Sequence, residues 1–157
     1  MKKVVFLDRD GVINQEIGDY VYELKSFVLN DGLESALQHW STKGFSFAII
    51  TNQGGISKKR YTKAHVLKIN SFLEKWFSDR DLNLLSISFC PHHHTIESCI
   101  CRKPDSLMLE KTIAKFNISV KDSFLIGDSL RDVQAAEKVG LKAYQIPANS
   151  NLNLLIS

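Results

Sequence analysis

Short apolar runs alternate along the chain with longer segments of mixed polarity. The runs are rich in β-branched and aromatic residues, which is typical of strands. We expect strands at Val4–Leu7, Phe47–Thr51, Leu85–Phe89, Phe124–Ile126 and Lys142–Ile146. Val4–Leu7 contains no polar residue, and such continuous runs predict strands that are buried on both faces of a parallel sheet.

The segments between the expected strands carry apolar residues at helical spacing. We expect helices near Gly32–Thr42, across Val66–Phe77, from about Leu107 to Phe116, and from about Arg131 to Val139. Thr62 is a candidate N-cap for the second helix, and Gly140 is expected to end the last one. This alternation of strands and helices favours an α/β fold, with a parallel sheet covered by helices on both faces.

The composition adds limits rather than a function. Of the 157 residues, 44% are hydrophobic and 24% are charged, which is ordinary for a globular protein. We expect residues 1–157 to form one domain and the protein to be monomeric. The net charge of +3 is too small to indicate a nucleic-acid partner, although it suits a small anionic substrate. Because the apolar run after Met1 is too short for an export signal, and no later run is long enough to span a membrane, we expect a cytoplasmic protein.

Two aspartates follow the first expected strand directly, in the sequence Asp8-Arg9-Asp10-Gly11. Ligands of open parallel sheets bind outside the carboxyl ends of the strands. Residues two apart in an extended chain share a face, and Gly11 permits a sharp turn. Two carboxylates this close repel each other, and a hard cation such as Mg²⁺, which prefers oxygen ligands, relieves that repulsion. An isolated Asp-x-Asp could also end a strand without any function.

Three further polar segments carry candidate chemistry. Thr51-Asn52-Gln53-Gly54-Gly55 closes the second strand, and glycine-rich polar turns of this kind present backbone N–H groups to anions. Asp128 follows the fourth strand, with Asp132 four residues later. Taken alone, Asp128 is more often a helix N-cap, the Thr51 segment a plain turn, and Lys103 a solvent-exposed lysine.

Together these segments occur in the order Asp-x-Asp, Thr, Lys, Gly-Asp-x-x-x-Asp. That order resembles the haloacid dehalogenase-like (HAD) superfamily of phosphohydrolases, and the resemblance extends from residue 4 to about residue 146. It implies a single Rossmann-like domain that hydrolyses phosphomonoesters through a phosphorylated aspartate. Hydrolysis is favoured over transfer to another acceptor because the second aspartate can activate water.

The resemblance also implies a role for each motif residue. Asp8 is expected to attack phosphorus, while Asp10 protonates the leaving group and later activates water. Magnesium is expected to bind Asp8, the Asp10 carbonyl and Asp128. Asp132 is expected to orient the loop or a metal-bound water. The phosphoryl oxygens are expected to contact Thr51, Asn52 and Lys103.

All three cysteines fall within twelve residues, in the pattern Cys-x-His…Cys-x-Cys. An odd number of clustered cysteines argues against a disulfide framework and indicates a metal site. Four such ligands suit a tetrahedral structural zinc, the alternative being a surface loop with incidental thiols. His92 is favoured over His93 and His94 because it gives the two halves the same spacing. The expected zinc ligands are Cys90, His92, Cys99 and Cys101.

The segment from Cys90 to Lys103 narrows the resemblance to a capless, zinc-bearing branch of the superfamily. Members of this branch act on a heptose 1,7-bisphosphate or on histidinol phosphate. The sequence Gly18-Asp19-Tyr20-Val21 resembles a Gly-Tyr-Val segment near the substrate in the heptose members, and this resemblance favours removal of the heptose 7-phosphate, with Asp19 as an additional residue in that loop. Expected substrate contacts are Asp8, Arg9, Asp10, Gly18, Tyr20, Thr51, Asn52, Gln53, Gly54, Arg102 and Lys103. An inactive zinc-stabilised binding module is a competing hypothesis, but it would not need the motif residues together.

Overall fold

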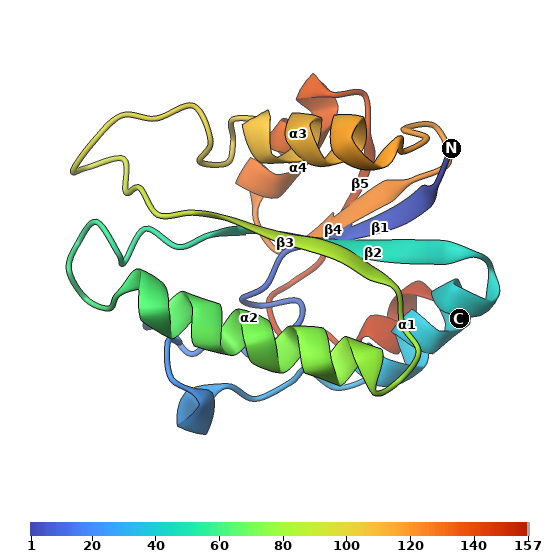
Figure 1. Cartoon of the computed structure of the whole chain (residues 1–157), viewed down its shortest axis with the longest axis horizontal. Helices are drawn as coiled ribbons and strands as arrows, with labels where there is room; N and C mark the ends of the chain where they lie inside the picture. Colours follow the sequence, from blue (N-terminus) through green and yellow to red (C-terminus); the bar gives the residue numbers. More distant parts are fainter. Residues whose placement is uncertain (157) are drawn as a thin grey trace.

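A single parallel sheet organises the computed structural model, which describes residues 1–156 (Figure 1). Its strands lie in the order β3-β2-β1-β4-β5. Their bounds are β1 (Lys3–Leu7), β2 (Phe45–Asn52), β3 (Leu84–Cys90), β4 (Phe124–Gly127) and β5 (Lys142–Gln145). Leu7 pairs with Ile49 of β2 on one side and with Ile126 of β4 on the other. The carboxyl ends of these three strands therefore lie side by side at one edge of the sheet.

Helices cover both faces of the sheet, so the expected α/β fold is confirmed. Their bounds are α1 (Leu33–Thr42), α2 (Lys63–Ser78), α3 (Leu107–Phe116) and α4 (Leu130–Lys138). Figure 1 shows α1 and α2 on one face and α3 and α4 on the other. Alternate residues of β1 enter the two cores, because Val5 joins the cluster on the α1 and α2 side and Val4 joins the opposite one. Both valines are fully buried, as expected for a strand with two covered faces.

The helix ends lie at the expected capping residues, and they decide whether Asp128 is a helix N-cap. Thr62 is the N-cap of α2, and Gly140, with φ +73°, follows the end of α4. Ser129 is the N-cap of α4, and its hydroxyl accepts from the Arg131 N–H at 3.1 Å. Asp128 is therefore not the helix cap, and its carboxylate can serve another purpose.

Two short 3-10 helices were not expected from the sequence. They are η1 (Leu24–Ser26), between β1 and α1, and η2 (Leu152–Leu155), near the end of the chain. Leu152 of η2 is fully buried in the core beside α1. β2 also begins at Phe45, two residues earlier than expected. None of these differences moves the carboxyl edge of the sheet.

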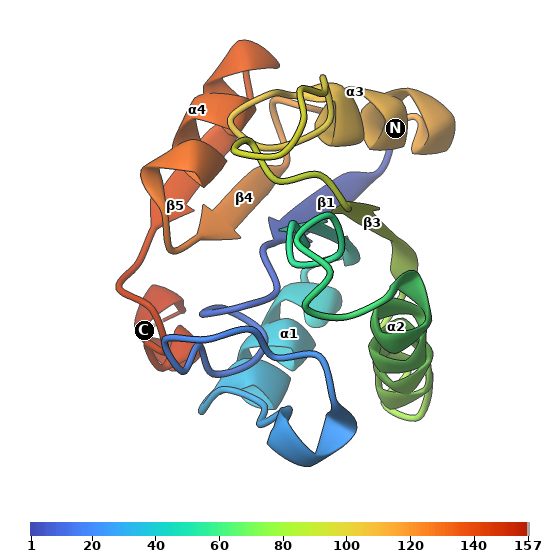
Figure 2. The same cartoon turned by 90° about the vertical axis from the view of Figure 1, so that its left-hand side faces the viewer.

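The carboxyl edge of the sheet is bordered by loops (Figure 2). Apart from η1, the chain between β1 and α1 has no regular helix, and α2 is the one helix between β2 and β3 in the described structure. Because loops rather than helices border this edge, it can hold a polar site.

Among the helices described, none combines the length and apolar character that a membrane span requires.

Candidate active site

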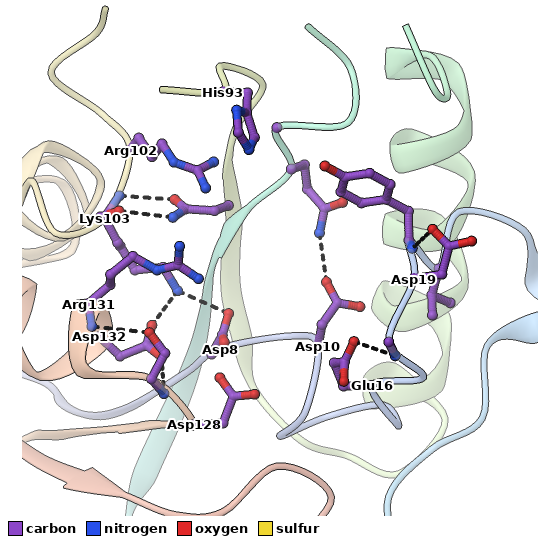
Figure 3. Close-up of a pocket in the computed structure, with 17 residues that line it drawn as sticks. Asp8, Asp10, Glu16, Asp19, His93, Arg102, Lys103, Asp128, Arg131 and Asp132 are labelled. Carbon is purple, nitrogen blue, oxygen red and sulfur yellow. Dashed lines mark hydrogen bonds and ion pairs between the residues drawn. The ribbon is translucent and has the colours of Figure 1, made fainter. Parts of the chain in front are cut away.

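A cavity of about 490 Å³ opens at the carboxyl edge of the sheet. Figure 3 shows Arg102, Lys103 and Arg131 on one side of it, and Asp10, Glu16 and Asp19 on the other. Most of the expected substrate contacts line this cavity, namely Asp8, Asp10, Gly18, Tyr20, Asn52, Gln53, Gly54, Arg102 and Lys103. Segments far apart in the sequence thus meet at one place, as the order of the motifs predicts.

Lys103 is the centre of a buried group of charges at the bottom of the cavity. Its Nζ donates to Asp8 Oδ1 at 2.9 Å, to Asp132 Oδ1 at 2.5 Å and to the Ile50 carbonyl at 2.8 Å. These contacts use all three hydrogens of the ammonium group. The Lys103 residue is only 3% exposed, so its position is fixed by these partners.

The Asp8 carboxylate is held from two directions. Its backbone N–H donates to the Ile126 carbonyl at 3.0 Å, which continues the pairing of β1 with β4 by one residue. The Arg9 N–H and Lys103 Nζ both donate to Oδ1, each at 2.9 Å. Asp8 also shares a side-chain hydrogen bond with Asp128. Both N–H donors thus bind the same oxygen of Asp8, on the side of Lys103.

Three carboxylates share this site with a single ammonium. Oxygen atoms of Asp8, Asp128 and Asp132 lie within 4.8 Å of one another. Burial raises the pKa of Asp8 to about 8 against the opposing charge of Lys103, and the charges of Asp132 and Asp128 also raise it. Burial also raises the pKa of Asp128, and Asp132 adds to this effect. Three carboxylates face one ammonium group, so the site lacks positive charge. Their oxygen atoms are the kind of ligand that a hard divalent cation prefers.

Gly11 allows the loop after β1 to pass close to this group. Its φ is +90°, in the region that favours glycine. A Cβ at this position would overlap the Asp128 carboxylate. The glycine of the Asp-x-Asp-Gly sequence is therefore required by both the turn and the neighbouring aspartate.

Asp10 is positioned by donors from three other side chains. Oδ1 accepts from Arg9 Nη2 at 2.9 Å and from Asn14 Nδ2 at 3.0 Å, and Oδ2 accepts from Gln53 Nε2 at 3.1 Å. The Asp10 side chain is still 29% exposed, toward the cavity. Arg9, an expected substrate contact, is 1% exposed and lies outside the cavity lining, where it also donates to the Val21 carbonyl. Its contacts favour a positioning role.

A second hydrogen-bonded chain leads away from Asp10. The same Gln53 Nε2 donates to Thr51 Oγ1 at 2.9 Å, and the Tyr61 hydroxyl donates to Gln53 Oε1 at 2.6 Å. Thr51 is 1% exposed and, like Arg9, does not line the cavity. Asn52 faces Lys103 instead, through two hydrogen bonds of 3.0 Å between its side-chain amide and the Lys103 backbone. Asn52 thus joins the end of β2 to the loop that carries the lysine.

The cysteine and histidine residues expected to bind zinc converge in the structure. Cys90 Sγ lies 3.0 Å from Cys101 Sγ and 3.7 Å from Cys99 Sγ. His92 Nδ1 lies 3.4 Å from Cys90 Sγ and 3.3 Å from Cys101 Sγ. Ligands of a tetrahedral zinc with Zn–S bonds of 2.3 Å are about 3.5–3.8 Å apart. Three of the four distances are shorter than this range, so the four ligand atoms are close enough to surround one zinc ion. His93 instead stacks on His94, with ring centroids 4.4 Å apart.

Several cavity residues were not expected from the sequence. Glu16, Asp19, His93, Ser129 and Arg131 all line it. Arg131 immediately precedes Asp132 in the first turn of α4, at the same edge of the sheet. Its position beside Asp132, shortly after the fourth strand, could have identified Arg131 from the sequence. Glu16, Asp19 and His93 lie in loops, where spacing does not predict the direction of a side chain.

Comparisons with known proteins agree with this site. The HAD-hydrolase-like family model matches residues 100–150. The D-glycero-beta-D-manno-heptose-1,7-bisphosphate 7-phosphatase of Pasteurella multocida is 35% identical over 147 residues, which cover 90% of this chain and 79% of that protein. The enzyme of the same name from Escherichia coli is 37% identical over 138 residues, covering 84% of this chain and 72% of the relative. The protein therefore belongs to the haloacid dehalogenase-like family and is a phosphatase.

A solved structure resembles the whole fold. The crystal structure of D,D-heptose 1,7-bisphosphate phosphatase from B. bronchiseptica, complexed with magnesium and phosphate, superimposes with a TM-score of 0.85 at 25% identity. The match covers 98% of this chain and 86% of that one. The parallel sheet and the helices on both of its faces are thus shared with a phosphatase of known structure.

Proposed function

We propose that this protein removes the 7-phosphate of D-glycero-D-manno-heptose 1,7-bisphosphate, with Asp8 as the nucleophile. The observation that carries the proposal is the pair of carboxylates at one cavity, each fixed by different donors. Asp8 is held by Lys103, and Asp10 is held by Arg9, Asn14 and Gln53. The names of the relatives support the choice of substrate.

The two carboxylates divide the reaction between them. Asp8 attacks phosphorus and becomes an aspartyl phosphate, while Asp10 gives a proton to the departing sugar oxygen. Asp10 then takes a proton from the water that hydrolyses the intermediate. Lys103, held against Asp8, supplies positive charge where negative charge concentrates on the phosphoryl oxygens.

Magnesium is the cation that we propose for the carboxylate group. Asp8, Asp128 and the backbone carbonyl of Asp10 would hold it, and when bound it offsets the repulsion between Asp8 and the phosphate. Asp132 is committed elsewhere, because one oxygen accepts from Lys103 and the other from the Ser129 N–H at 3.2 Å. We therefore assign Asp132 to positioning Lys103 and the start of α4.

We also propose a structural zinc on Cys90, His92, Cys99 and Cys101. These residues lie within one segment that ends directly in Arg102 and Lys103. Four protein ligands leave no position for water, which is the arrangement of a structural site. Zinc would hold this segment rigid and so place both basic side chains at the cavity.

A substrate comparison with magnesium present tests the proposal. Heptose 1,7-bisphosphate, histidinol phosphate and an aryl phosphate would be compared by kcat/KM, with phosphate release as the readout. We expect the heptose bisphosphate to have the highest value, because the ammonium group of histidinol phosphate would be repelled by Arg102 and Arg131. Faster turnover of histidinol phosphate would overturn the proposed substrate, and no turnover of any ester would favour a binding module.

A further inference from the structure

Two of the arginines differ from the rest in having no acidic partner. Arg9, Arg60 and Arg80 each form an ion pair with a carboxylate. Arg102 and Arg131 form none within residues 1–156, although both line the active-site cavity. Arginine side chains that face a cavity without a carboxylate leave several N–H donors for a ligand.

These two arginines come from different elements and lie close enough to repel each other. Arg102 follows the zinc segment and is tied to it by an Nη1 hydrogen bond to the His92 carbonyl at 3.0 Å. Arg131 lies in the first turn of α4. The two side chains line the active-site cavity together, and they also line a second cavity beside it together. Two like charges that lie near each other, neither of them in an ion pair, are stabilised when an anion lies between them.

The phosphate that reacts already has a positively charged partner in Lys103, which is held against Asp8. That phosphate must lie against the same carboxylate. Figure 3 shows Arg102 and Arg131 on the Lys103 side of the cavity, with His93 above them. A cavity of about 490 Å³ has room for a sugar with two phosphates. A second anion on the same substrate would therefore meet the two guanidinium groups.

We propose that Arg131, together with Arg102, binds the non-reacting phosphate of a sugar bisphosphate. Arg131 is then a residue that determines substrate specificity. This inference rests on the proposed function. The planar guanidinium fork matches two phosphate oxygens at once, which an ammonium group cannot do. The two forks approach from separate elements, so one phosphate can accept hydrogen bonds from both.

The kinetic test compares a sugar bisphosphate with the monophosphate that is cleaved at the same sugar oxygen. Heptose 1,7-bisphosphate and heptose 7-phosphate would be assayed with the parent, Arg131→Gln, Arg131→Lys and Arg102→Gln. Charge-assisted hydrogen bonds of about 1.5–3 kcal/mol predict that Arg131→Gln reduces the bisphosphate-to-monophosphate ratio of kcat/KM by roughly 10–100-fold. Arg131→Lys should recover only part of the ratio. Lys111→Gln, on the exposed side of α3, controls for the loss of one positive charge.

A binding measurement separates this inference from the proposed function. In the Asp8→Asn background, calorimetry would give Kd for the bisphosphate and for the monophosphate, with and without Arg131→Gln. We expect Arg131→Gln to weaken the bisphosphate at least tenfold more than the monophosphate. If the parent hydrolyses a different sugar bisphosphate, the same ratio with that sugar still tests Arg131. Equal losses on both ligands, or a parent that binds monophosphates as tightly as bisphosphates, would overturn the inference.

Discussion

The bottom and the rim of the active-site cavity are built in opposite ways. At the bottom, Lys103 is buried and forms ion pairs with both Asp8 and Asp132. At the rim, Arg102 and Arg131 come from a loop and a helix end and have no acidic partner in the described structure. Fixed charges suit a transition state, because they need no reorganisation during the reaction. Unpaired charges suit recognition, since the substrate supplies their partner.

This contrast separates the residues that act on every phosphate ester from those that contact the variable part of the substrate. Every phosphate ester presents the same reacting group to the bottom of the cavity. The rest of the substrate meets Tyr20, Arg102 and Arg131, whose surroundings are loops and the first turn of α4. Loops on a rigid scaffold commonly carry specificity. We therefore expect substitutions at the bottom to affect all substrates equally and those at the rim to discriminate among them.

Asp8→Asn should have the largest effect. The amide keeps the shape of the side chain but cannot act as a nucleophile, so we expect turnover to fall by about 10⁴-fold or more. Circular dichroism and zinc content should match those of the parent. Fluoroberyllate should load Asp8 in the parent only. Appreciable turnover by the variant, with deamidation excluded by mass spectrometry, would defeat the covalent mechanism.

Lys103→Ala should come next and should not discriminate between substrates. Removing a positioned charge from a transition state costs roughly 10²–10³-fold in kcat. The loss should be similar for heptose bisphosphate and for an aryl phosphate, because Lys103 contacts Asp8 rather than the rim. Initial-rate measurements on both esters check this. A loss confined to the bisphosphate would place Lys103 with the rim residues.

Cys99→Ser should act on stability more than on chemistry. A structural zinc contributes folding free energy, so we expect the zinc content to fall from about one per chain and Tm to drop by roughly 10 °C. Activity should fall by about tenfold, because the segment that ends in Arg102 and Lys103 loses its rigidity. Metal analysis and thermal unfolding measure both effects. Ser98→Ala, at the neighbouring exposed position, is the matched control. Parent protein purified without chelator and found to lack zinc would contradict the assignment.

Tyr61→Phe should have the smallest effect, and the effect should depend on the leaving group. The Tyr61 hydroxyl orients the Gln53 amide, whose Nε2 then donates to Asp10. Losing one buried hydrogen bond of about 1 kcal/mol predicts a decrease of roughly fivefold in kcat. The decrease should be larger for a sugar phosphate than for an aryl phosphate, whose leaving group needs less protonation by Asp10. Equal decreases would show that Tyr61 does not act through the acid.

The sequence predicted most of the fold because its signals were local. Short runs rich in apolar residues marked the five strands, although polar residues interrupt the runs of β3 and β5, and Thr62 and Gly140 marked helix ends. The start of β2 was missed because Phe45-Ser46 has no continuous apolar character. The helix η2 was missed for a different reason. Of its three leucines, Leu152 is the buried one, and its burial depends on α1, which is far away in the sequence.

The residues of the candidate site also divide into those that local sequence motifs predicted and those that depend on tertiary contacts. The motifs brought Asp8, Lys103 and Asp128 together, since each followed a recognisable element or segment. The contact of Asp132 with Lys103 could not be inferred, because it joins residues 29 positions apart through the path of a long side chain. Tyr61 does not belong to a helical or strand pattern of apolar residues, so the sequence does not indicate where its side chain points. Pairings of this kind are decided by tertiary structure alone.

The place of β1 in the sheet has a consequence for how the protein folds during synthesis. β1 is made first and lies at the centre, but its neighbour β4 is made more than a hundred residues later. The three strands β1 to β3 can pair early, whereas Asp8 must wait for Lys103 and for the start of α4. Contacts so distant in sequence form slowly. We therefore expect nascent chains that end before Asp128 to expose the carboxyl edge of β1, and the catalytic centre to be among the last parts of the molecule to assemble.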